Sequence, residues 1–405
     1  MKARLLVSLI LLVAVGLVLW VSLGHKSAGS SGHPPNADAG PADGLSSPAQ
    51  TKATGQREPE GISGITPTKE GKARILQSIR EALEAMRGGN PGEIERTLAK
   101  LGGMLREPGD RAAAIAAIVE FLGTGEDART GKGFVVGEGG VLAESSTLRV
   151  YLMDWLGQLC GSPTTDEALE VARGTLASFG SADEWAISMR NFAWAAPERR
   201  EFLVERVNAM IRHPQWQEHP STGMLEAYDV IVHTKSLDAV PELARQISKE
   251  ESPLGRASGV ALDRLASSYP LELTSLLNQQ RDLMAATPLV RADLFAHADV
   301  AVPEQRAQLE TYLLRPDVDA VEREKFFSSL IQTGQFVSHN LLTPYIPPEE
   351  PEQAAVRLGK LVETVNGWMR DGRFAAISGE LATFGEAVNG IVDEISADEA
   401  AGGQK

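Results

Sequence analysis

The chain has 405 residues, of which 43% are hydrophobic and 23% are charged, an ordinary balance for a globular protein. Its formal net charge of −15 repels phosphate backbones, so we expect no nucleic-acid partner. A single cysteine, Cys160, excludes an internal disulfide.

The first element in chain order is an uncharged run over residues 5–24. Twenty helical residues span about 30 Å, the thickness of a bilayer's hydrocarbon core. Lys2 and Arg4 precede the run and favour a cytoplasmic N-terminus. A cleaved signal peptide is the alternative, but its apolar core is shorter, about 7–15 residues. We therefore predict a transmembrane anchor or uncleaved signal over residues 1–24.

Residues 25–70 are rich in Gly, Ser, Pro and Ala, with few large apolar side chains. Such a segment buries too little surface to offset the entropy of ordering it, which predicts a disordered linker. A second polar stretch, residues 397–405, is predicted to be a disordered tail. This organisation predicts a single-pass protein whose C-terminal domain is exported, to the periplasm or cell exterior, most simply from a bacterial inner membrane.

The sequence predicts helices almost throughout residues 71–396. Ile75, Ile79, Leu83 and Met86 are spaced by four, four and three residues, which places them on one helical face. Residues 111–122 are nearly all apolar and predict a buried helix. Capping-box patterns occur at Thr164/Glu167 and Ser181/Glu184. Further helix starts are marked by a proline, at Pro91, Pro197, Pro241, Pro253, Pro270, Pro288 and Pro303.

These helix starts recur about every 15–20 residues, and pairs of them about every 35–40. In this rhythm the chain resembles the HEAT-like α-solenoid class. The resemblance implies an all-α fold of stacked antiparallel helical hairpins, with an extended surface for a partner. No residue-level repeat accompanies the rhythm, so an irregular all-α array is the alternative.

The last predicted helices cover residues 354–369 and 374–395. The second carries a heptad-like apolar stripe, which indicates either a dimer contact or, as we favour, the cap of the helical array. The stripe consists of Ile377, Leu381, Phe384, Val388, Ile391 and Ile395.

One stretch inside the helical region, residues 123–144, is irregular and holds seven glycines; we call it the glycine-rich loop. Apolar residues flank Gly-Glu-Gly-Gly, which is consistent with a small hairpin. Gly131-Lys132-Gly133 departs from the phosphate-binding pattern, because Glu126 replaces a required glycine and Gly133 a required hydroxyl. We predict a long inter-helix loop and keep it as a candidate binding edge.

No other motif predicts a catalytic, cofactor-binding or metal-binding residue. His213, His219 and His233 are close in sequence, but no His-Glu-x-x-His pattern occurs, and Pro214 and Pro220 indicate a loop. Tryptophans of residues 182–195 are expected in the core. We therefore expect no cofactor and no metal.

The sequence favours a membrane-tethered helical scaffold or protein-interaction module without catalytic activity, with a protein or peptide as partner. Two alternatives stay open: an exported all-α enzyme with a carboxylate-lined cleft, and a structural spacer of the cell envelope. An enzyme is expected to gather acids or histidines from distant helices into one cleft with shifted pKa values.

Overall fold

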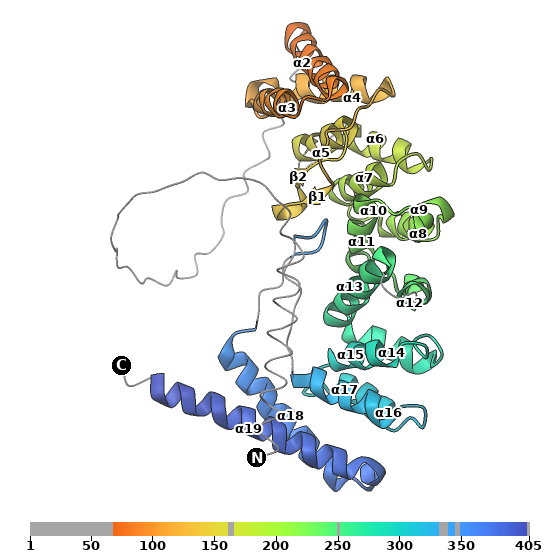
Figure 1. Cartoon of the computed structure of the whole chain (residues 1–405), viewed down its shortest axis with the longest axis vertical. Helices are drawn as coiled ribbons and strands as arrows, with labels where there is room; N and C mark the ends of the chain where they lie inside the picture. Colours follow the sequence, from red (N-terminus) through yellow and green to blue (C-terminus); the bar gives the residue numbers. More distant parts are fainter. Residues whose placement is uncertain (1–67, 161–165, 249–251, 332–338, 345–348, 403–405) are drawn as a thin grey trace, which may run out of the picture. The chain divides into compact units, whose positions relative to one another are not determined.

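The computed structural model describes residues 68–160, 166–248, 252–331, 339–344 and 349–402 (Figure 1). These residues are overwhelmingly helical, which confirms the all-α prediction. The predicted anchor and most of the predicted linker lie outside the described residues. Within the ranges that are described, no helix is both long enough and apolar enough to cross a membrane.

The helices of the N-terminal half are α2 (Lys69–Gly88), α3 (Pro91–Leu105), α4 (Arg111–Gly123), α5 (Leu148–Cys160), α6 (Asp166–Leu176), α7 (Ala182–Ala195), α8 (Arg200–Ile211), α9 (Pro214–Glu218), α10 (Thr222–Glu226) and α11 (Asp229–His233). Those of the C-terminal half are α12 (Val240–Ile247), α13 (Pro253–Ser268), α14 (Pro270–Gln279), α15 (Pro288–Ala296), α16 (Pro303–Leu313), α17 (Ala320–Ile331), α18 (Pro351–Arg370) and α19 (Ser378–Gly402). Short 3-10 turns, η1 to η4, lie between some of them.

Most predicted helix starts coincide with observed ones. Asn90 caps α3 by accepting from the backbone N–H groups of Gly92 (3.1 Å) and Glu93 (3.3 Å), with Pro91 in the first turn. Pro241, Pro253, Pro270, Pro288 and Pro303 each occupy one of the first two positions of a helix. Backbone N–H groups in the first turn of a helix have no partner within the helix, so a proline there removes no hydrogen bond.

The predicted start at Pro197 is wrong. A backbone hydrogen bond from Arg199 N to Ala196 O (3.0 Å) closes a turn around this proline, and α8 begins only at Arg200. The Ser181/Glu184 box is half formed. Ser181 Oγ accepts from Glu184 N (3.3 Å), but the Glu184 carboxylate binds Arg149 instead (2.9 and 3.0 Å). Thr164 lies outside the described residues.

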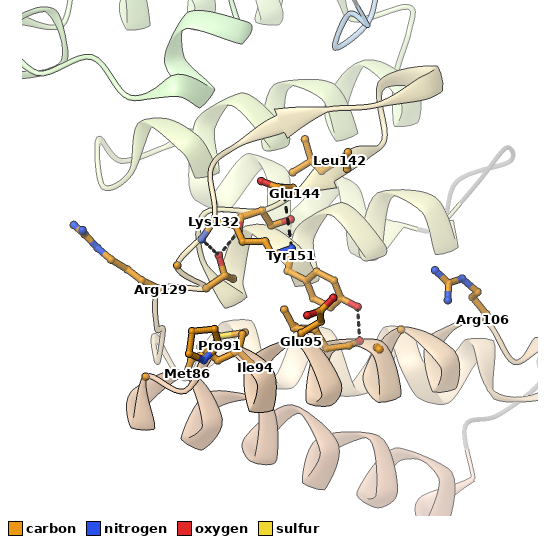
Figure 2. Close-up of a pocket in the computed structure, with 18 residues that line it drawn as sticks. Met86, Pro91, Ile94, Glu95, Arg106, Arg129, Lys132, Leu142, Glu144 and Tyr151 are labelled. Atoms are coloured by element: carbon orange, nitrogen blue, oxygen red, sulfur yellow. Dashed lines mark hydrogen bonds and ion pairs between the residues drawn. The ribbon is translucent and has the colours of Figure 1, made fainter. Parts of the chain in front are cut away.

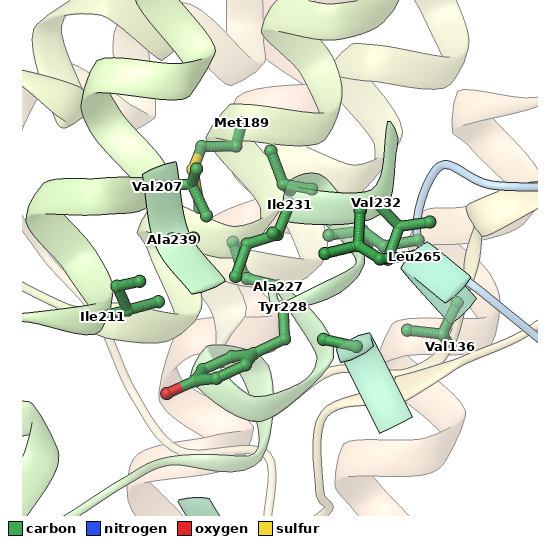
Figure 3. Packing of buried hydrophobic residues seen from close by; sticks show 14 of the residues in the cluster. Val136, Met189, Val207, Ile211, Ala227, Tyr228, Ile231, Val232, Ala239 and Leu265 are labelled. Carbon is green, nitrogen blue, oxygen red and sulfur yellow. The ribbon is translucent and has the colours of Figure 1, made fainter. Parts of the chain in front are cut away.

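Helices close in sequence contact one another along the described chain. Helix α2 packs against α3 and α4, α5 against α4 and α7, and α13 against α11, α12, α14 and α15; further on, α15 packs against α17. The apolar faces meet in one cluster of buried side chains, shown around Tyr228 and Ile231 in Figure 3. Ile75, Ile79, Leu83 and Met86 all belong to it, as the helical spacing predicts.

Of the two tryptophans expected in the core, Trp185 is buried as predicted and Trp194 is not fully buried. Trp185 and Cys160 are fully buried, and Trp216 is nearly so. Trp194 is only partly buried, and the Arg190 guanidinium lies 4.0 Å from the centre of its ring. A cation over an indole face explains why this tryptophan stays at the edge of the core.

The C-terminal stripe is covered by a neighbour within the chain. Leu381, Phe384 and Val388 are buried, and α19 packs against α18 and α17. The predicted helix over residues 374–395 is divided, because the Asp371 side chain accepts from Arg373 N (2.9 Å) and opens the 3-10 turn η4 (Gly372–Ile377) before α19. Helix α19 continues to Gly402, past the predicted start of the tail, through an alanine-rich stretch of high helix propensity.

The glycine-rich loop contains the predicted hairpin. Strand β1 (Val135–Val136) pairs antiparallel with β2 (Leu142–Glu144), with Val135 opposite Glu144. Gly139 and Gly140 turn the chain at φ of +65° and +79°, values at which a side chain is strained. The hairpin packs on α5 and α10, and Val136 inserts into the core cluster (Figure 3).

Candidate functional site

A cavity of about 550 Å³ lies between α3 and the glycine-rich loop; we call it the loop pocket. Its volume is within the range of ligand-binding pockets, roughly 300–1,000 Å³. The end of α2 and Tyr151 of α5 complete the wall (Figure 2). Apolar side chains line much of it, namely Met86, Ile94, Leu98, Ala99, Leu142 and Ala143.

The base of the glycine-rich loop is closed by main-chain contacts. Thr130 N donates to Ser146 O (3.1 Å), and Thr130 Oγ donates to Ser145 O (2.5 Å). Arg129 and Thr147 form an isolated antiparallel bridge beside them. Residues 130–145 are therefore held as one closed loop rather than as an open connection between helices.

The tip of the loop is fixed by a buried ion pair. Arg190 of α7 and Asp154 of α5 are joined through Nη1 and Oδ1, and Arg190 also donates to Gly140 O (2.7 Å). Asp154 Oδ1 accepts from Leu142 N (3.2 Å), and Asn191 Oδ1 accepts from Arg190 Nη2 (2.8 Å). Burial lowers the pKa of the Arg190 guanidinium, and the charge of Asp154 opposes that effect. The network reaches the loop pocket through Leu142, the one residue of this group that lines it.

Tyr151 also lines the loop pocket and joins α5 to α3. Its hydroxyl donates to Leu98 O (3.2 Å), so α5 is bonded directly to the backbone of α3. A side chain on Gly102 would come within 2.9 Å of that hydroxyl, which explains a glycine inside α3. Burial raises the pKa of Tyr151, so the phenol remains a neutral donor near pH 7.

The rim of the loop pocket is cationic although the chain is acidic. Arg106 and Arg129 are exposed and lie at opposite ends of the residues labelled in Figure 2. Among the described residues neither forms an ion pair, and Arg106 lies over the Trp155 ring at 5.1 Å. Lys132 lies 3.7 Å from Glu144, and Glu95 adds a second acid. The arrangement suits an apolar segment that carries carboxylates.

A second cavity, of about 480 Å³, lies between α16 and α18. Acids and bases are mixed around it, and its acidic residue Glu310 is already bonded to Arg373 (3.0 Å) and to Trp368 Nε1 (3.2 Å). Its polar groups are thus largely satisfied within the chain, so we place the candidate site at the loop pocket.

The histidines discussed above lie apart in three surroundings. His213 stacks on Phe179 (4.5 Å between ring centres), His219 is exposed beside Glu218, and His233 is exposed at the end of α11. In the ranges the structure covers, no three His, Cys, Asp or Glu side chains are grouped for a metal ion. His339 is exposed.

His297 forms a hydrogen-bonded chain that the sequence does not reveal. Its Nε2 lies 2.7 Å from Asp263 Oδ1, and its Nδ1 lies 3.0 Å from Ser267 Oγ. In a hydrolase triad the carboxylate binds Nδ1 and the serine hydroxyl binds Nε2, the reverse of this arrangement. Such a site also has backbone N–H groups that stabilise an oxyanion. Ser267 lies inside α13, whose N–H groups bond along the helix. We interpret this chain as a link between α13 and α15.

From the sequence we predicted no catalytic, cofactor-binding or metal-binding residue. The residues that line the loop pocket were not assigned any function at that stage. The glycine-rich loop was the one available signal, while Tyr151, Arg106 and Leu98 carried none. Comparison with protein-family models, with curated proteins and with solved structures finds no match to this chain.

Proposed function

We propose that the chain is a membrane-tethered, exported helical scaffold that binds a protein or peptide partner and catalyses no reaction. The observation that carries this proposal is the loop pocket, an apolar cavity with two arginines at its rim that form no ion pair with any described residue, in a chain of net charge −15. Because the protein as a whole is acidic, it does not attract anions in general. A local excess of cations therefore favours binding of an acidic ligand at this one place.

The partner segment that fits is apolar and acidic. Leucine-like side chains would occupy the lining around Leu98 and Leu142, and carboxylates would face Arg106 and Arg129. Arginine binds carboxylates with paired N–H groups, so both ends of such a segment would be positioned. Stacked helical hairpins, the finer form of the fold prediction, would extend this surface along neighbouring helices.

The binding prediction is tested with full-length protein in mild detergent against an array of short peptides that combine Leu or Phe with Asp or Glu. Arg106→Gln with Arg129→Gln should weaken binding about two- to thirtyfold, since each exposed charge pair contributes roughly 0.2–1 kcal/mol. Added salt should weaken wild-type binding as well.

Arg96→Gln is the matched control, because Arg96 lies on α3, is exposed and does not line the loop pocket. It should bind like wild type. Equal binding of peptides in which Asn and Gln replace the acids would contradict the charge argument, and so would an equal loss in the Arg96→Gln variant.

The predicted linker boundary at residue 70 is too late, because Thr68 caps α2, which begins at Lys69, so the tether is proposed from residues 1–24 and 25–67. About 45 flexible residues have a root-mean-square reach of some 35–40 Å, which lets the helical part search near the membrane. Washing membranes with alkaline carbonate should leave the full-length protein in the pellet, because a spanning helix is not extracted by high pH. Its appearance in the wash would reject the anchor.

A further inference from the structure

A short segment near the C-terminal helices docks on the middle of the chain. Residues 340–343 contact Asp229, which precedes them by more than 110 residues, and Gly140, which is about 200 residues away. Figure 1 draws this segment in blue beside the hairpin of β1 and β2. We call the surface formed by Gly140, Asp229 and Arg264 the cradle.

The cradle holds the segment by its main chain. The N–H groups of Leu342 and Thr343 both donate to Asp229 Oδ2, at 2.6 and 2.9 Å. Thr343 Oγ donates to Asp229 Oδ1 and accepts from the Arg264 guanidinium. On the other side, the Leu341 carbonyl oxygen lies where a side chain on Gly140 would be, so only glycine allows this approach.

One side chain of the segment is deeply buried. Leu341 is 0% exposed within the core cluster, and Leu342 is partly buried against it. Burial of a leucine contributes roughly 1.5–3 kcal/mol. The segment thus presents one anchoring leucine, two successive N–H donors and one hydroxyl.

Both sides of the cradle are fixed by residues that do not belong to the segment. Arg264 Nη1 binds Asp229 Oδ1 (2.9 Å), and Arg190 binds the Gly140 carbonyl (2.7 Å). Asp229 is 6% exposed with the segment in place, and its bond to Arg264 orients the carboxylate without any contribution from the segment. Short peptides are commonly recognised by a preorganised site that binds their backbone amides and one apolar side chain.

We propose that the cradle is a peptide-binding site for an uncharged Leu-Leu-Thr or Leu-Leu-Ser segment of a partner protein, and that residues 340–343 occupy it in competition with that partner. This inference rests on the proposed function, since it names a second partner element. A ligand tethered in the same chain acts at an effective concentration of order millimolar, so a free peptide binds weakly until the internal segment is released.

The probe is a fluorescent Asn-Leu-Leu-Thr peptide, and the matched control peptide is Asn-Ser-Leu-Thr. Leu341→Ser with Thr343→Ala weakens the internal segment and leaves the cradle intact. This variant should bind the probe at least tenfold more tightly than wild type and should discriminate against the control peptide. Adding Asp229→Asn should abolish the gain.

A measurement on the wild-type chain covers the case in which the variant misfolds. Excess probe should accelerate hydrogen exchange at the Leu342 and Thr343 amides, and the control peptide should not. A folded variant that binds both peptides equally, or neither, overturns the proposal, as does unchanged exchange at saturating probe. The probe is uncharged, so the cradle and the arginine rim of the loop pocket can fail independently.

Discussion

Replacing Asp154 with alanine should lower the free energy of unfolding by about 3–5 kcal/mol, the usual cost of removing one partner from a buried ion pair. Arg190 is 0% exposed, and its guanidinium would keep only uncharged oxygen partners and the Trp194 ring. Leu142 N would lose its acceptor at the same time. Urea denaturation of the full-length protein in detergent measures the change.

The same variant should weaken binding of acidic peptides, because Leu142 lines the loop pocket and Gly140 is held by Arg190. Glu170→Ala is the control, since Glu170 belongs to an exposed pair with Arg173 (2.7 Å) that should contribute well under 1 kcal/mol. A loss below 1 kcal/mol for Asp154→Ala would mean that the loop is not fixed by this ion pair.

Glu322→Ala should be comparably destabilising, by about 3–5 kcal/mol. Glu322 is 1% exposed and binds Arg291 of α15 through two hydrogen bonds of 2.7 Å, and it also accepts from Tyr312 Oη (2.9 Å). Burial alone would lower the pKa of Arg291, but Glu322 and Asp317 outweigh it and the pKa is raised. Removing the carboxylate leaves the Tyr312 phenol without its acceptor and leaves Arg291 with one acidic partner, the more exposed Asp317 at 3.3 Å.

A triple variant separates the cost of a broken pair from the contribution of the pair itself. Arg291→Met, Tyr312→Phe and Glu322→Leu together remove all three polar groups, and apolar replacement of a buried pair is often neutral. The triple variant should therefore be more stable than Glu322→Ala alone. If the triple variant is the less stable of the two, this network contributes net stability and our explanation of the single variant is wrong.

The sequence predicted those parts of the fold that depend on neighbouring residues. The spacing of Ile75, Ile79 and Leu83 and the proline starts report on one helix at a time, and most of these predictions are confirmed. The predicted helix start at Pro197 is wrong because proline occurs in turns as well as at helix starts. Only the backbone hydrogen bonds that follow it distinguish the two structures.

The candidate site was not predictable in the same way, because its contacts join distant residues. Tyr151 and Leu98 are 53 positions apart, and Arg190 and Asp154 are 36 apart. An isolated arginine or tyrosine on a predicted helix carries no signal about such partners. Seven glycines in one stretch did indicate irregular backbone, which is why the glycine-rich loop was the only part of the site kept as a candidate.

The central claim, that the loop pocket binds a partner protein, is tested most directly by co-purification from native membranes. Tagged full-length protein is extracted in mild detergent, and the proteins that accompany it are identified by mass spectrometry. We predict a partner in stoichiometric amount that is lost from the Arg106→Gln/Arg129→Gln variant and retained by Arg96→Gln. A protein that purifies alone, or a partner retained equally by all three, would contradict the proposed function.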